Sequence, residues 1–211
     1  MTYSVKEIFL TLQGEGAQAG RRAVFLRFSG CNLWTGREED RSKAICQFCD
    51  TDFVGTDGEN GGKFASAEEL AQKVKEVWGR TVAGTPYVVI TGGEPMLQLD
   101  GPLVGALHDQ GFEIGVESNG TLPATPGVDW LCISPKAGSA VVQRTGQELK
   151  LVWPQPGSDW QDMQGWGFDH FLIQPMDNAA RAENLAEAIE FVMANPQWRL
   201  SLQNHKALGL P

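Results

Sequence analysis

The chain has 211 residues, enough for one large domain or two small ones. Its net charge of −9 argues against a general surface for nucleic acid or anionic membranes. No apolar run reaches the roughly 20 residues that span a bilayer, and the N-terminus has no secretory signal pattern. Three of the four cysteines are bunched, which is untypical of a disulfide framework, so we expect a single cytoplasmic domain, residues 1–211, with reduced thiols.

Short apolar runs separated by turn residues predict a series of strands along the chain. The run at 87–90 is wholly apolar, so we expect that strand to be buried on both faces. The expected strands are residues 5–11, 24–28, 87–90, 113–117, 130–134, 148–153, 171–173 and 199–202.

Three amphipathic or capped segments predict helices. Ser66 and Glu69 form a capping box at the start of the first, and Asn178 caps the third. Residues 154–167 are too rich in Gly, Pro and Trp to predict a helix. The expected helices are residues 66–77, 99–108 and 178–194.

The alternation of strands and helices implies parallel βαβ units and an α/β fold. Only three helices serve about six parallel strands. We therefore expect an incomplete TIM-like barrel with a reduced helical cover, in which polar residues at the carboxyl ends of the strands meet on one face.

Three cysteines lie in the loop after the second strand. Cys46 and Cys49 form a C-x-x-C pair, and 14 residues lie between Cys31 and Cys46. Three thiolates suit zinc or an iron–sulfur cluster. Structural zinc takes four ligands, but Cys132 lies in an apolar run where we expect it to pack in the core, and no histidine has a ligand-like spacing. Three thiolate ligands without a fourth favour a 4Fe–4S cluster with one open iron. The alternatives are a zinc ion with another fourth ligand, or no metal.

Arg27 stands inside an otherwise apolar strand. A buried arginine needs an anionic partner, and a substrate carboxylate held by both guanidinium edges would provide one. The alternative is an internal ion pair, for which the candidates are Glu15, Glu94 and Glu117.

The cysteine loop and the stretch GGEP at 92–95 together resemble radical S-adenosylmethionine enzymes. The usual C-x3-C-x2-C spacing is extended here, because Thr35 stands at the second position and a polar insertion moves that cysteine to Cys46. Ordered blocks along nearly the whole chain are similar to the 7-carboxy-7-deazaguanine synthase family, in which extended spacing also occurs. They are residues 8–16, 25–33, 49–51, 90–95, 117–121, 134–136, 174–177 and 202–206.

The resemblance implies a lyase-type enzyme of queuosine (7-deazapurine) biosynthesis. Such enzymes convert 6-carboxy-5,6,7,8-tetrahydropterin to 7-carboxy-7-deazaguanine and ammonia by radical ring contraction. The implied cofactors are a 4Fe–4S cluster, S-adenosyl-L-methionine and Mg²⁺; the radical comes from the cofactor, so no side chain is implied as catalytic. The implied partners are the pterin, a second copy of the chain in a homodimer, and an electron donor such as flavodoxin or ferredoxin.

The resemblance also implies roles for individual residues. Cys31, Cys46 and Cys49 would hold the cluster and Thr51 the magnesium ion, although a turn-capping hydroxyl is the alternative for Thr51. S-adenosylmethionine would be bound by Phe48, Asp50, Gly93, Glu94, Glu117, Ser134, Pro135, Lys136, Gln174, Pro175, Met176 and Asp177. The substrate would be bound by Leu12, Gln13, Gly14, Glu15, Arg27, Thr91, His205 and Pro211.

Two glutamates, the C-terminal tail and the insertion each allow more than one interpretation. Glu15 and Glu117 could orient the pterin amino groups, contact the cofactor ribose, or pair with Arg27. The tail at 203–211 would close the substrate site, unless His205 is only a mobile terminal residue. Within the cluster-binding loop at 31–52, the insertion at 36–45 is too polar for a core, so we expect an exposed loop or short helix over one side of the cluster. The competing enzyme class, activases that make a glycyl radical, normally keeps the C-x3-C-x2-C spacing.

Overall fold

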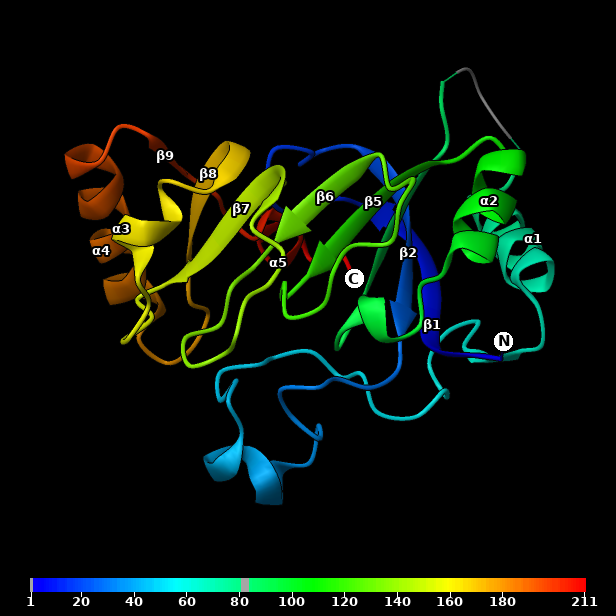
Figure 1. Cartoon of the computed structure of the whole chain (residues 1–211), viewed down its shortest axis with the longest axis horizontal. Coiled ribbons are helices and arrows are strands. Elements are labelled where there is room, and N and C mark those ends of the chain that lie inside the picture. Colours follow the sequence, from blue (N-terminus) through cyan, green and yellow to red (C-terminus); the bar gives the residue numbers. More distant parts are fainter. Residues whose placement is uncertain (1, 81–83) are drawn as a thin grey trace.

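The computed structural model describes residues 2–80 and 84–211 and arranges this part of the chain around one curved sheet (Figure 1). The strands follow the order β3-β1-β2-β4-β5-β6-β7-β8-β9. From β2 to β9 all neighbours are parallel, whereas β1 is antiparallel to both β2 and β3. The outermost strands do not pair with each other, so the barrel is open, as predicted. The strands are β1 (Tyr3–Leu12), β2 (Arg22–Phe28), β3 (Gly62–Phe64), β4 (Tyr87–Gly92), β5 (Glu113–Ser118), β6 (Trp130–Ile133), β7 (Thr145–Trp153), β8 (Gly167–Pro175) and β9 (Trp198–Leu200).

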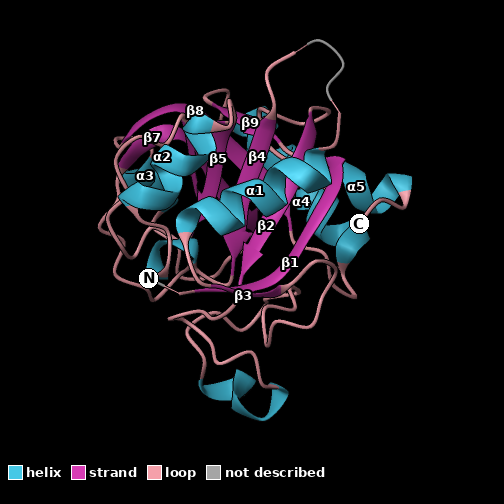
Figure 2. Cartoon of the chain, turned by 90° about the vertical axis from the view of Figure 1, so that its right-hand side faces the viewer, coloured by secondary structure: helices cyan, strands magenta, loops and turns pink. Residues whose placement is uncertain are grey.

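Three helices cover the outside of the sheet. Helix α1 packs on β1 and β2, α2 packs on β5, and α4 packs on β8 and β9 (Figures 1 and 2). These are the three predicted helices, and α3 is a single unpredicted turn within 154–167. In the described residues, every helix is too short or too polar to cross a membrane. The helices are α1 (Ala67–Trp78), α2 (Gly101–Asp109), α3 (Trp160–Met163), α4 (Arg181–Ala194) and α5 (Asn204–Leu208), with the 3₁₀-helices η1 (Glu38–Lys43) and η2 (Pro95–Leu97).

The two predicted helix caps have different outcomes. Ser66 accepts a hydrogen bond from the Glu69 amide at 3.2 Å, which confirms the start of α1. The start of α4 was predicted wrongly, because the helix begins at Arg181 and its N-cap is Ala180. Asn178 instead accepts from the Ala180 amide at 2.8 Å. An asparagine readily binds backbone two residues ahead, and this makes a turn before the helix rather than a cap.

Strand β2 shows how the sheet separates its two faces. Val24, Leu26 and Phe28 are fully buried in the apolar layer beneath the outer helices, whereas Phe25 and Arg27 alternate with them and face the inner side. Burying each large apolar side chain contributes about 1.5–3 kcal/mol. A one-residue slip would place Arg27 in the apolar layer, so this burial fixes the register that aims it inward.

Candidate active site

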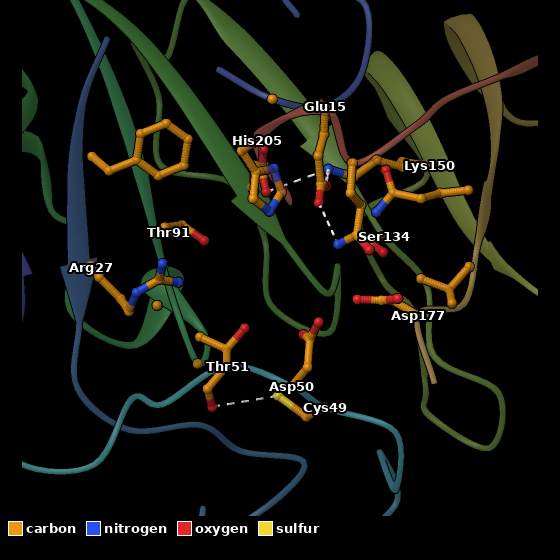
Figure 3. Close-up of a pocket in the computed structure, with 18 of the residues that line it drawn as sticks. Glu15, Arg27, Cys49, Asp50, Thr51, Thr91, Ser134, Lys150, Asp177 and His205 are labelled. Atoms are coloured by element: carbon orange, nitrogen blue, oxygen red, sulfur yellow. Dashed lines mark hydrogen bonds and ion pairs between the residues drawn. The ribbon is translucent and has the colours of Figure 1, made fainter. Parts of the chain in front are cut away.

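A cavity of about 440 Å³ lies on the inner face of the sheet, at the carboxyl ends of the parallel strands (Figure 3). Parallel strands that end at one edge bring residues distant in sequence together. All of the predicted site residues line this cavity except Cys31, Glu94 and Pro135. Its wall also contains residues for which no binding role was predicted: Lys6, Glu7, Phe9, Phe25, Asp52, Gly92, Ser118, Asn119, Lys150, Val152, Gln203 and Lys206.

The cysteine loop forms one end of the cavity. Cys46 and Cys49 line it, and Cys31 lies just behind, where its Sγ accepts a hydrogen bond from the Leu33 amide at 3.4 Å. Burial raises the pKa of the Cys31 and Cys46 thiols, and the neighbouring Cys49 raises both further. Neighbouring thiolates repel one another, so a bound cation would favour the thiolate forms.

The donor set fits an iron–sulfur cluster. In residues 2–80 and 84–211, no three Cys, His, Asp or Glu side chains converge closely enough to share a single metal ion. The cysteine loop at one end of the cavity supplies three thiols, which is the kind of donor that binds the irons of an iron–sulfur cluster. Cys132 is buried in β6, 3.4 Å from a carboxylate oxygen of Glu148, so the prediction that it packs in the core is confirmed.

Glu94 lies behind the cavity wall instead of in it. Its buried carboxylate accepts hydrogen bonds from the Ser118 hydroxyl at 2.9 Å, the Asn119 amide at 2.8 Å and the Met96 amide at 2.9 Å. Burial raises the pKa of this carboxyl. Glu94 therefore ties the end of β4 to the end of β5. Gly93 is the residue that meets the cysteine loop, since a Cβ there would lie 2.6 Å from Cys31 Cβ.

Arg27 is paired, but with a different glutamate from those expected. Its Nε donates to Glu7 Oε1 at 2.7 Å, because the antiparallel register sets Glu7 opposite Arg27. None of the three glutamates expected from the sequence is its partner. Within the described residues its two terminal nitrogens have no hydrogen-bond partner, and they point into the cavity beside Thr91 (Figure 3).

A buried lysine that sequence reasoning missed joins the two ambiguous glutamates. Lys150 Nζ lies 2.6 Å from Glu15 Oε2 and 3.4 Å from Glu117 Oε2 (Figure 3). Gln13 donates to Glu117 at 2.9 Å, and Gln203 donates to Glu15 at 2.8 Å. Burial alone would raise the pKa of Glu15, but Lys150 holds it at about 2. Both glutamates pair with this lysine, and neither pairs with an arginine.

Residues of the C-terminal tail line the cavity. The Asn204 amide donates to the Gly14 carbonyl at 2.9 Å, and the Thr11 hydroxyl donates to the terminal Pro211 at 3.4 Å. Lys206 Nζ lies 2.7 Å from the carboxylates of both Asp50 and Asp177. The tail thus joins the turn after β1, the loop after Cys49 and the end of β8.

The remaining polar groups lie nearer the cysteines. Lys136 donates to the Ser134 carbonyl and hydroxyl at 2.8 and 2.6 Å, and burial lowers the pKa of this lysine. The Thr51 side chain faces the cavity (Figure 3), and its hydroxyl makes no hydrogen bond within the described chain. A capping role for Thr51 therefore has no support in the structure.

The insertion extends beyond the carboxyl ends of the strands (Figure 1). It contains η1, none of whose residues is buried, which confirms the expected exposed segment with a short helix.

The chain is similar to known proteins over its whole length. It is 61% identical over 214 residues to the 7-carboxy-7-deazaguanine synthase of Caulobacter vibrioides and 58% identical over 211 residues to that of Bordetella pertussis, covering all of each. Its fold is similar to the crystal structure of QueE from Escherichia coli, with a TM-score of 0.70 and 28% identity, covering 97% of this chain and 95% of that one. No protein-family model matches the chain. The two sequence alignments span the whole chain, so they include every residue that lines the cavity.

Proposed function

The chain belongs to the family of 7-carboxy-7-deazaguanine synthases, which are radical S-adenosylmethionine enzymes, and we propose that it converts 6-carboxy-5,6,7,8-tetrahydropterin to 7-carboxy-7-deazaguanine and ammonia. When bound, the cluster and S-adenosylmethionine supply the carbon radical that starts the ring contraction. The protein's own residues bind and orient the two small molecules. The observation that carries the proposal is one cavity that combines a free arginine edge, two glutamates paired with a buried lysine, and a cysteine loop at one end.

Arg27 would hold the substrate carboxylate. Its Nε–Glu7 ion pair fixes the plane of the guanidinium, and the two terminal nitrogens remain for a second carboxylate. The inner-face aromatics Phe9 and Phe25, whose ring centroids lie 5.5 Å apart, offer an apolar wall beside it.

Glu15 and Glu117 would accept hydrogen bonds from the N–H groups of the pterin ring. An ionised carboxylate offers about four lone-pair sites, of which Lys150, Gln13 and Gln203 use only some. Thr91, His205, Pro211 and the backbone of residues 12–14 would complete this end of the site.

The cofactor would lie between the cysteines and the ends of β6 and β8. Cys31, Cys46 and Cys49 would hold the cluster. Ser134, Lys136 and Gln174 would face the polar ends of S-adenosylmethionine. The cofactor would also contact Phe48, Asp50, Gly93, Pro175, Met176 and Asp177. Glu94 and Pro135 would act from behind this wall, and Thr51 would offer its free hydroxyl to Mg²⁺, a cation that prefers oxygen ligands.

The same proposal extends to the C-terminal tail, the oligomeric state and the electron donor. Residues 203–211 would close over bound substrate, because the Lys206 bridge already links the tail to both walls of the mouth. We further propose a homodimer in the cytoplasm that receives its electron from flavodoxin or ferredoxin.

Anaerobic reconstitution tests the cluster directly. We expect about four irons per chain and an iron–sulfide charge-transfer band. Alanine at Cys31, Cys46 or Cys49 should abolish both, whereas Cys132→Ala is the matched control and should keep them. Uptake of tetrahedral zinc with no iron would contradict the proposal. Turnover with the carboxylated tetrahydropterin, reductant and Mg²⁺ should then yield the deazaguanine and ammonia.

A further inference from the structure

The insertion between the first two cysteines forms a loop whose two ends are hydrogen-bonded to each other. The chain leaves the cysteine loop after Leu33 and returns to the same residue, whose carbonyl accepts hydrogen bonds from the Ile45 amide at 3.1 Å and the Cys46 amide at 3.5 Å. Cys46 therefore lies close to Cys31 in space although 14 residues separate them. Residues 34–44 form an arm that hangs outside the barrel (Figures 1 and 2).

One side chain of this arm reaches back to the C-x-x-C turn. Arg41 Nη1 donates to the carbonyls of Gln47 at 2.9 Å and Cys49 at 3.0 Å. Gln47 lies between the two cysteines of the pair, and Cys49 is the second of them. The guanidinium thus spans the turn that carries both thiols.

Arg41 is itself held from two other sides. Its Nε lies 2.8 Å from both carboxylate oxygens of Glu38, and its guanidinium carbon lies 4.1 Å above the ring centroid of Trp34. Trp34 is buried and meets Phe53 edge to face at 5.6 Å. A planar guanidinium can stack on an aromatic ring and bind carbonyls in its plane at the same time, which a lysine cannot do.

We propose that Arg41 is the positioning residue of the Cys46–Cys49 turn, and that the insertion places its guanidinium against the carbonyls of this turn. Charge alone does not explain the contact, because the side chains of Arg37 and Lys43 in the same arm make no hydrogen bond in the described chain. By fixing two carbonyls of the turn, Arg41 holds the thiols of Cys46 and Cys49 toward the cavity. The insertion that lengthens the cysteine spacing therefore also supplies the side chain that holds the Cys46–Cys49 turn. This inference rests on the proposed binding of a cluster.

The test follows cluster retention in reconstituted protein. Arg41→Ala, Arg41→Lys and the matched control Arg37→Ala are loaded anaerobically, iron and sulfide are measured, and the decay of the charge-transfer band is followed after addition of an iron chelator. We expect the band of Arg41→Ala to decay about five- to tenfold faster than that of the wild type, with Arg41→Lys between them and Arg37→Ala unchanged. Because the arm lies outside the sheet, the thermal unfolding of all the apoproteins should coincide.

Each contrary result has a distinct meaning. Decay of Arg41→Ala at the wild-type rate overturns the role of Arg41 while leaving cluster binding in place. Equal acceleration in Arg37→Ala also overturns it, because any change in the arm would then suffice. A wild-type chain that takes up no iron overturns the cluster, and the role of Arg41 with it.

Discussion

Replacing Lys150 with methionine would remove the buried cation that lies between the carboxylates of Glu15 and Glu117. The Lys150 and Glu15 side chains are only 4% and 14% exposed, and their charged atoms lie 2.6 Å apart. Methionine approximately conserves the volume, so packing changes little. Losing one partner of a buried ion pair leaves the other charge uncompensated, which costs about 3–5 kcal/mol. We expect the free energy of unfolding at pH 7 to fall by this amount, a large share of the roughly 5–15 kcal/mol that holds a typical domain folded.

The pH dependence of this loss has a defined sign. In the wild type the pKa of Glu15 is about 2, below its model-peptide value of 4.5, so the pair's contribution is present above pH 4.5 and is lost as the pH falls toward 2. Without Lys150, burial raises the pKa of Glu15 above 4.5, and the carboxyl can fold in its neutral form at mildly acidic pH. The difference between variant and wild type should therefore shrink between pH 7 and pH 5. Urea denaturation at both pH values measures it.

A second variant separates charge from shape. Glu15→Gln keeps an acceptor for Gln203 but carries no charge, so in the Lys150→Met background it should recover most of the lost stability. If Lys150→Met unfolds within about 1 kcal/mol of the wild type at pH 7, a typical size for a surface pair, the buried ion pair is not the stabilising feature inferred here.

Two further predictions concern binding at either end of the cavity. Arg27→Ala should weaken binding of the carboxylated pterin by about 1.5–3 kcal/mol in calorimetry and leave S-adenosylmethionine affinity unchanged, and an unchanged pterin affinity would make Arg27 structural. Gly93→Ala should reduce iron uptake, because the new Cβ would lie 2.6 Å from Cys31 Cβ. The control Gly105→Ala in α2, with no atom within 4 Å, should keep full uptake and raise the free energy of unfolding by about 0.5–1 kcal/mol; equal iron uptake by both variants would contradict the argument.

The parallel strands could be predicted because each is a short apolar run closed by a polar residue. The apolar run at 87–90 predicts a strand buried on both faces, and all four of its residues are buried. Strand β3 and helix α5 were missed because neither carries a periodic apolar pattern. Three residues pairing at a sheet edge gain their structure from β1, which local sequence does not reveal.

The site was predicted well where it lies at strand ends and poorly where it depends on pairing. The partner of Arg27 is set by the register of β1 against β2, and the apolar pattern leaves that register open because a shift of two residues keeps the same faces buried. Lys150 was not predicted as a site residue because it lies within β7 and not at the end of the strand. Its signal was nevertheless present, since Lys150 stands between Leu149 and Leu151, and a charge between two core residues must face the other side of the sheet.

The cavity's charges are arranged as a substrate with two unlike ends would require. Arg27 offers free donors at one side, and Glu15 (Figure 3) and Glu117 offer acceptors at the other. Lys150 lies between the two carboxylates and balances negative charge on the acceptor side, so this side can accept hydrogen bonds from N–H groups without repelling an anionic substrate strongly. The overall charge of −9 gives no hint of this, because specificity here comes from which few charges are buried and how each is paired.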